Sequence, residues 1–189
     1  MKPVVFTAVL ALTPLVPACR SNASAAAEEP VKIEKLAPYA CGSIANMHTL
    51  SGVFLASQPS ASDFEAARAA GVKTVVNLRT PAEQPDFDEQ ALVTGLGLAY
   101  VHLPWNGADQ LTDEVFTRSR ELLNTAERPL LVHCASANRV GAVWIPWRVL
   151  DGGLTLDEAA AEARTIGLKT AEYEAKARDY VARHPRPKH

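Results

Sequence analysis

The stretch HCASANR at residues 133–139 constrains both the fold and the chemistry of this chain. It follows an apolar run, PLLV at residues 129–132, and precedes a segment from residue 140 to about residue 150 that can form a helix. In a strand, tight loop and helix arranged in this order, the loop amides and the positive end of the helix dipole point toward one place. The sequence therefore predicts an anion-binding loop that begins with Cys134 and ends with Arg139.

Cys134 and Arg139 are residue types suited to reactions of a tetrahedral anion. The positive field of the loop favours the thiolate form of Cys134, which is the nucleophilic form. The Arg139 guanidinium can bind two oxygens of the anion through paired hydrogen bonds. A buried structural cysteine at a strand end is the alternative for Cys134, but an arginine at loop spacing favours a functional one.

Strand and helix patterns alternate from residue 53 onward. The strand patterns lie at residues 53–56, 72–78, 98–103 and 129–133, and the helical patterns lie at residues 60–70, 86–95, 112–126, 140–150, 155–166 and 170–183. This alternation predicts an α/β fold with a mainly parallel central sheet of four to five strands and helices on both faces. Ligands of such sheets bind at the carboxyl ends of strands, where Cys134 falls.

The N-terminal residues resemble an export signal. Lys2 precedes an apolar stretch at residues 4–16, and VPAC at residues 16–19 resembles a bacterial lipobox with Cys19 as the lipidated residue. Ordinary cleavage near residues 21–27 is the alternative. We expect a signal peptide over residues 1–18, a tether over 19–40, one domain over 41–184 and a tail over 185–189. An exported protein of the bacterial periplasm, or one tethered to the outer membrane through Cys19, is therefore predicted.

Composition and residue spacing limit the ligands of the domain. The 189 residues carry a formal net charge of −2 without a basic stripe, which gives no support to nucleic-acid binding. His48, His102, His133 and the acidic residues show no metal-ligand spacing, so no metal is expected. Cys41 is expected to be a small buried residue without a partner, because a disulfide with Cys134 would block the nucleophile. A reversible disulfide between the two, acting as a redox lock, is the alternative.

Three stretches together resemble the cysteine-dependent phosphatase superfamily. They are ASQPS at residues 56–60, VVNLR at residues 75–79 with Glu83 after it, and HCASANRVG at residues 133–141. The likeness is to the bacterial dual-specificity-like group, which includes the phosphatase-like domain of the beta-lactamase-hydrolase-like proteins and the phosphatase domain fused to NAD kinase. It covers roughly residues 52–150.

The resemblance implies a two-step phosphoester hydrolysis that needs no cofactor. Cys134 would attack phosphorus and hold a cysteinyl-phosphate, while Arg139 and the loop amides bind the equatorial oxygens. The substrate would be a phosphorylated protein or small molecule. The implied substrate-binding residues are His133, which orients the loop, and Ala135, Ser136, Ala137 and Asn138.

A carboxylic acid must also protonate the leaving oxygen and then activate water. In relatives it comes from a loop after an earlier strand, which corresponds here to residues 105–111, where Asp109 is the only acid. Asp113 is an alternative that suits a helix start. Asp86 and Asp88 are further candidates, more typical of a solvated helix face.

The loop departs from the common phosphatase pattern. Four residues instead of five separate the cysteine from the arginine, and Ala137 replaces the usual glycine, at a cost of roughly 1 kcal/mol if its φ is positive. Val140 follows Arg139, where a Ser or Thr is common, so Ser136 or Asn138 would have to polarise the sulfur. Two alternatives therefore stay open: a rhodanese-like sulfurtransferase with a persulfide on Cys134, and a catalytically impaired phosphate-binding module.

The sequence also suggests roles for one further arginine and three tryptophans. Arg79 either helps to hold substrate or forms a surface ion pair with Glu83. Trp105 is expected to line the pocket. Trp144 and Trp147 are expected to be core residues.

Overall fold

The computed structural model describes residues 20–21, 35–83 and 85–184. The strands are β1 (Arg20–Ser21), β2 (Ala37–Ala40), β3 (Met47–Leu50), β4 (Val53–Ala56), β5 (Thr74–Asn77), β6 (Ala99–His102) and β7 (Leu130–His133). The helices are α1 (Ala61–Ala69), α2 (Glu89–Gly95), α3 (Asp113–Thr125), α4 (Asn138–Leu150), α5 (Leu156–Ile166) and α6 (Ala171–Arg183). Two short 3₁₀ helices are η1 (Pro81–Glu83) and η2 (Ala108–Gln110).

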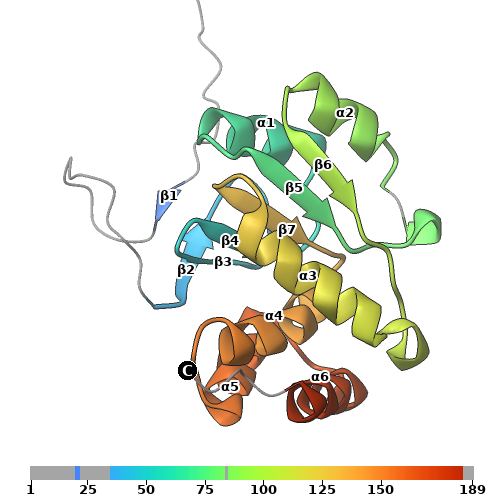
Figure 1. Ribbon diagram of the computed structural model, residues 1–189. Helices are drawn as coiled ribbons and strands as arrows, with labels where there is room; N and C mark the ends of the chain where they lie inside the picture. The colour runs from blue at the N-terminus through green and yellow to red at the C-terminus, as the bar shows by residue number, and fades with distance from the viewer. Residues whose placement is uncertain (1–19, 22–34, 84, 185–189) are drawn as a thin grey trace, which may run out of the picture.

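The strands form one mixed sheet in the order β1-β2-β3-β4-β7-β5-β6. β4, β7, β5 and β6 run parallel, and β1 to β4 pair antiparallel in sequence order. Helices α1 and α2 cover one face of the sheet, and α3 to α6 cover the other (Figure 1). The predicted α/β class, with a parallel centre and helices on both faces, is confirmed.

The antiparallel part of the sheet was not predicted. β3 and β4 are joined by the two-residue turn Ser51-Gly52, in which both residues have positive φ, at 49° and 76°. Such turns match the twist of a two-stranded ribbon. β2 lies inside the predicted tether, so the ordered sheet begins before Cys41.

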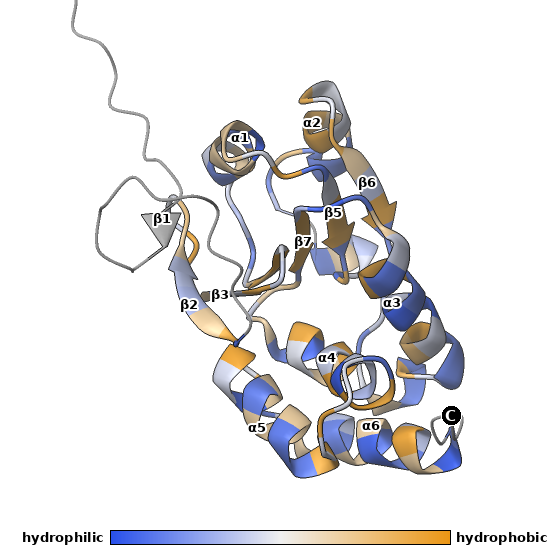
Figure 2. Ribbon diagram, turned by 60° about the vertical axis from the view of Figure 1, so that its left-hand side comes forward, coloured by the Kyte–Doolittle hydropathy of each residue, from blue (hydrophilic) through white to orange (hydrophobic). Residues whose placement is uncertain are grey.

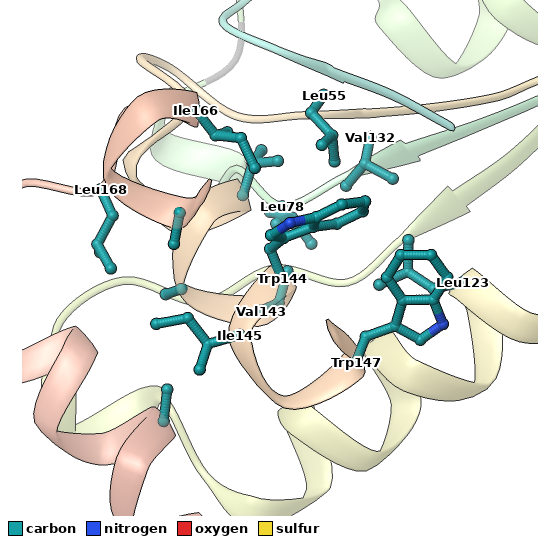
Figure 3. Close-up of a cluster of buried hydrophobic side chains, with 14 of the residues drawn as sticks. Leu55, Leu78, Leu123, Val132, Val143, Trp144, Ile145, Trp147, Ile166 and Leu168 are labelled. Atoms are coloured by element: carbon teal, nitrogen blue, oxygen red, sulfur yellow. The ribbon is translucent and has the colours of Figure 1, made fainter. Parts of the chain in front are cut away.

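Apolar side chains fill both sides of the sheet. β5 and β7 are buried along their whole length and are mainly hydrophobic, whereas the covering helices mix hydrophobic with hydrophilic residues (Figure 2). Trp144 and Trp147 pack with their rings 4.7 Å apart, among side chains from the sheet and neighbouring helices (Figure 3). Their assignment to the core is confirmed.

Local capping explains most of the helix starts. Ser60 and Asp63 form a capping box at α1, and Thr155 and Glu158 form one at α5. Helix α4 begins at Asn138, two residues before the predicted start, because Ala137 adopts the left-handed conformation and turns the chain directly into the helix.

The two described cysteines differ. Cys41 is disulfide-bonded, whereas Cys134 is free and buried. The expectation that Cys41 has no partner was wrong, and its partner is not Cys134. The predicted signal peptide, Cys19 and the tail at residues 185–189 lie outside the described residues. Within the described part of the chain, no helix has the length and apolar character needed to cross a membrane.

Candidate active site

Cys134 lies at the carboxyl end of β7, in the centre of the parallel part of the sheet. The amide of Cys134 donates to the carbonyl of Ala56 at the end of β4, over 3.3 Å. Its side chain is 1% exposed. The predicted position of Cys134, at the ligand-binding edge of a parallel sheet, matches the observed topology.

The loop after Cys134 presents unpaired amides. Apart from the isolated bridge between Ser57 and Ser136, the described residues show no hydrogen bond from the amides of residues 135–139 to a carbonyl. Asn138 and Arg139 already belong to the first turn of α4, so the helix dipole adds positive potential to these amides. Ala135 and Ser136 are exposed to solvent. The loop can therefore receive an anion from solvent.

Ala137 takes the conformation expected of the missing glycine. Its φ is 65° and its ψ is 2°, and its side chain is fully buried. A left-handed non-glycine residue costs about 1–2 kcal/mol. Contacts with the surrounding structure must therefore offset this conformational energy.

Part of this support comes from the segment between α5 and α6. The side-chain oxygen of Asn138 accepts hydrogen bonds from the amides of Lys169 and Thr170, at 2.7 and 3.2 Å. Asn138 Nδ2 donates to Thr170 Oγ1 at 2.8 Å. The Asn138 side chain therefore anchors the loop to the helical layer, and it is not available to polarise the Cys134 sulfur.

Arg139 is held by three acceptors from other parts of the chain. Its Nη1 and Nη2 donate to the two carboxylate oxygens of Glu83, at 2.7 and 2.6 Å. Nη1 also lies 2.9 Å from the carbonyl of Trp105 and 3.2 Å from that of Leu78. Bonding to Arg139 lowers the pKa of Glu83 to about 2, although burial opposes the shift. Burial opposes a rise in the pKa of Arg139, but Glu83 and the adjacent Cys134 outweigh it.

This arrangement corrects the expectation for Arg79. Glu83 pairs with Arg139, and the Arg79 guanidinium instead donates from Nη1 to Gln58 Oε1. The acidic residue four places after the strand-ending arginine was the available signal. Sequence proximity favours Arg79 as the partner of Glu83, but proximity does not show which side chains the loop brings together.

Asp109 lies on η2 and is exposed, with no hydrogen-bond partner among the described residues. Its loop is held by a bond from the amide of Gly107 to the Tyr173 hydroxyl, at 3.0 Å. Two of the other candidate acids are engaged elsewhere, because Asp113 pairs with Arg183 and Asp88 caps α2, whereas Asp86 is exposed. Asp109 therefore remains free to act on a ligand.

Trp105 precedes the Asp109 loop but does not line an open pocket. Its side chain is 1% exposed and packs edge-on against Tyr173, with ring centroids 5.0 Å apart. The pocket-lining prediction was wrong. The carbonyl of Trp105, rather than its ring, contributes to the site by accepting from Arg139.

His133 is fully buried, and its Nε2 lies 3.0 Å from Glu89 Oε1. Sequence reasoning did not identify Glu89. His102 bonds to the backbone carbonyl of Arg79, and His48 lies on β3. Within residues 35–83 and 85–184, no group of three or more histidine, cysteine or acidic side chains could hold a metal ion.

The family model for the phosphatase-like domain of the beta-lactamase hydrolase-like proteins matches residues 47–149. A beta-lactamase hydrolase-like protein of Xylella fastidiosa is 30% identical over 117 residues, which are 60% of this chain and 27% of that protein. The corresponding protein of Agrobacterium fabrum is 25% identical over the same length. The chain therefore spans about a quarter of the length of these curated relatives.

Solved structures with the same fold include phosphatases. TpbA of P. aeruginosa has a TM-score of 0.58 and 26% identity, over 76% of this chain and 86% of that one. The core catalytic domain of the PP-IP phosphatase SIW14 from S. cerevisiae has a TM-score of 0.63 and 20% identity, over 75% and 88% of the two chains. The chain belongs to the family of phosphatase-like domains found in beta-lactamase hydrolase-like proteins, within the cysteine-dependent phosphatase superfamily.

Proposed function

We propose that this protein hydrolyses phosphate monoesters through a cysteinyl-phosphate on Cys134. The observation that carries this proposal is the convergence on one loop of a free cysteine, unpaired amides and an arginine fixed by Glu83. Nη1 of Arg139 is occupied by protein acceptors, so Nε and the second hydrogen of Nη2 are left for two oxygens of a phosphoryl group. The sulfur and the amides then act on the same group.

In the first step the Cys134 thiolate attacks phosphorus, and the bond to the ester oxygen breaks. The leaving alkoxide or phenoxide takes a proton from Asp109. In the second step Asp109 accepts a proton from water, which attacks phosphorus and releases inorganic phosphate and the thiolate. The amides of residues 135–139 and Arg139 neutralise the equatorial oxygens in both steps.

Phosphotyrosine is the substrate group we propose to test first. TpbA, which has the same fold, has been crystallised with phosphotyrosine at 25% identity to this chain. A dual-specificity enzyme would also accept phosphoserine or phosphothreonine. A panel of phosphopeptides that differ only in the phosphorylated residue distinguishes these substrates.

The decisive experiment is turnover of p-nitrophenyl phosphate by the purified domain. We expect release of phosphate that is abolished by Cys134→Ser and by vanadate. Absence of turnover in the wild type across the pH range would reject the proposal. Phosphate binding that survives in Cys134→Ser would then indicate the binding module, and transfer of sulfur from thiosulfate to cyanide would indicate a sulfurtransferase.

We also propose that the protein is exported across a bacterial membrane. The support is the charged and apolar N-terminus with VPAC at residues 16–19, and the disulfide-bonded state of Cys41, which is typical of oxidising compartments. Mass spectrometry of the periplasmic and membrane fractions should find a chain shortened by signal-peptide cleavage, and an uncleaved chain in the cytoplasm would overturn export. The chain has three cysteines, of which Cys134 is free and Cys41 is disulfide-bonded, so a lipid on the Cys19 sulfur would require Cys41 to pair with another molecule. Mass spectrometry without reduction distinguishes a disulfide at Cys19 from a lipid there.

A further inference from the structure

A buried carboxylate adjoins the histidine that precedes the nucleophile. Glu89 begins α2, 44 residues before His133 in the chain, yet both side chains are 0% exposed and bond to each other. Nδ1 of His133 is buried without a hydrogen-bond partner in the described structure. The bond to Glu89 is therefore the polar contact that holds this imidazole among the described residues.

Every described partner of the Glu89 carboxylate is a donor. Gln58 Nε2 donates at 2.8 Å and the Tyr100 hydroxyl at 3.2 Å, in addition to His133 Nε2. Burial acts to raise the pKa of Glu89, but the hydrogen bonds from His133, Gln58 and Tyr100 outweigh it and the pKa is lowered. An ionised carboxylate only accepts hydrogen bonds, so the proton in this pair belongs to Nε2 of His133.

The donors around Glu89 are themselves fixed by the end of the sheet. Asn77 at the end of β5 donates to the Tyr100 hydroxyl at 2.9 Å, and Arg79 donates to Gln58. Phe64 of α1 packs edge-on against the His133 ring, with centroids 5.7 Å apart. Glu89 is thus a rigid acceptor, directed at a ring one residue from Cys134.

We propose that Glu89 is a positioning residue for the phosphatase reaction. Its carboxylate fixes the tautomer and orientation of His133, and through them the turn from β7 into the loop that presents Cys134. This proposal rests on the proposed function, since it assigns Glu89 a role in that reaction. The competing interpretation is a buried pair that only stabilises the fold, and it predicts no specific effect on the chemical step.

The test compares Glu89→Gln with Tyr100→Phe in the full-length protein. Glu89→Gln keeps the size of the side chain but removes the charge that fixes the Nε2 proton. We expect kcat for p-nitrophenyl phosphate to fall about 10-fold to 100-fold with KM little changed, as for loss of a buried charged hydrogen bond. Tyr100→Phe removes another donor to the same carboxylate without touching His133, and it should leave kcat within about twofold.

A double-mutant cycle with His133→Asn shows whether Glu89 acts through the histidine. If it does, the double variant has the kcat of His133→Asn alone, because the two losses do not add. Independent losses that multiply would overturn the proposal, as would a Glu89→Gln variant with wild-type kcat. If Glu89→Gln does not fold, Glu89→Asp, which keeps the charge but is too short to reach His133, takes its place.

Two readouts separate this proposal from the proposed function. The ¹⁵N shifts of the His133 ring report its tautomer, and the rate at which iodoacetamide labels the Cys134 peptide reports the presentation of the thiol. Both should change in Glu89→Gln and not in Tyr100→Phe. An inactive wild type that still shows these changes would reject the phosphatase while supporting the role of Glu89, whereas unchanged shifts and labelling would reject that role.

Discussion

The Glu83 carboxylate and the Arg139 guanidinium form a two-bond ion pair across 56 residues of sequence. Arg139 is almost fully buried, and the side chain of Glu83 is 27% exposed. Paired geometry of this kind fixes the plane of a guanidinium as well as its place. Glu83 therefore determines which N–H groups of Arg139 remain for a ligand.

Glu83→Gln should lower phosphatase activity. An amide can accept only one of the two bonds, so Arg139 loses its fixed plane and the oxygens of the transition state lose alignment. We expect kcat to fall about 10-fold or more, the equivalent of one charged hydrogen bond. Steady-state kinetics with p-nitrophenyl phosphate measure this. Glu65→Gln removes the same charge from an exposed position on α1 and should have no effect; equal activity of the two variants would contradict the prediction.

The same pair predicts a loss of stability in acid. The pKa of Glu83 is about 2 in the folded protein, against 4.5 ordinarily, so its stabilisation is complete above pH 4.5 and is lost as the pH falls toward 2. Solvent screening limits the effect to about 1–2 kcal/mol. Urea unfolding at pH 6, 4 and 3 should show a smaller loss in Glu83→Gln than in wild type. If the free energy of unfolding falls with pH by the same amount in both proteins, Glu83 contributes nothing to acid sensitivity.

Asp109→Asn tests the identity of the general acid. Loss of a positioned acid typically costs about 100-fold to 10,000-fold in rate when the leaving group is poor. We therefore expect a large fall in kcat for phenyl phosphate and a smaller one for p-nitrophenyl phosphate, whose leaving group needs less protonation. Asp113→Asn is the matched control, because Asp113 already pairs with Arg183. If both substrates respond equally, Asp109 is not the acid.

Gly167→Ala should disturb the loop through its support. Gly167 has φ of 137°, and a Cβ built there would lie 3.1 Å from the carbonyl oxygen of Ser136 and 3.2 Å from Cβ of Ala137. Gly71→Ala is the control, since Gly71 also has positive φ, 93°, but open space around it. We expect both variants to lose about 1–2 kcal/mol in urea unfolding, and only Gly167→Ala to lose kcat. Unchanged kcat in Gly167→Ala would show that the loop tolerates movement there.

The parallel core of the fold could be predicted from the sequence because its signals are local. The predicted strand at residues 53–56 coincides with β4, and three predicted helical ranges begin at the residues that cap the observed helices, Ser60, Thr112 and Thr155. The pattern is less clear in β2 and β3, because their residues mix polar with apolar types and their pairing depends on a partner strand and a turn.

The site residues likewise fall into those that the sequence predicts and those that it does not. Cys134, Arg139 and the left-handed Ala137 follow from one contiguous stretch of sequence. Glu83 and Glu89 could not be assigned their partners, because each pairs with a residue that only the folded sheet brings close to it. The error on Trp105 has a related cause, since its loop turns the ring toward α6 and leaves only its carbonyl at the site.

Residues 169–170, which bond to Asn138, lie beyond the family match, which ends at residue 149. A fragment limited to residues 47–149 would therefore keep Cys134 and Arg139 but lose the hydrogen bonds to Asn138 that help to hold Ala137 in its left-handed conformation. The shortest fragment that we expect to be active extends through α6. Shorter fragments should have a distorted phosphate-binding loop and no activity.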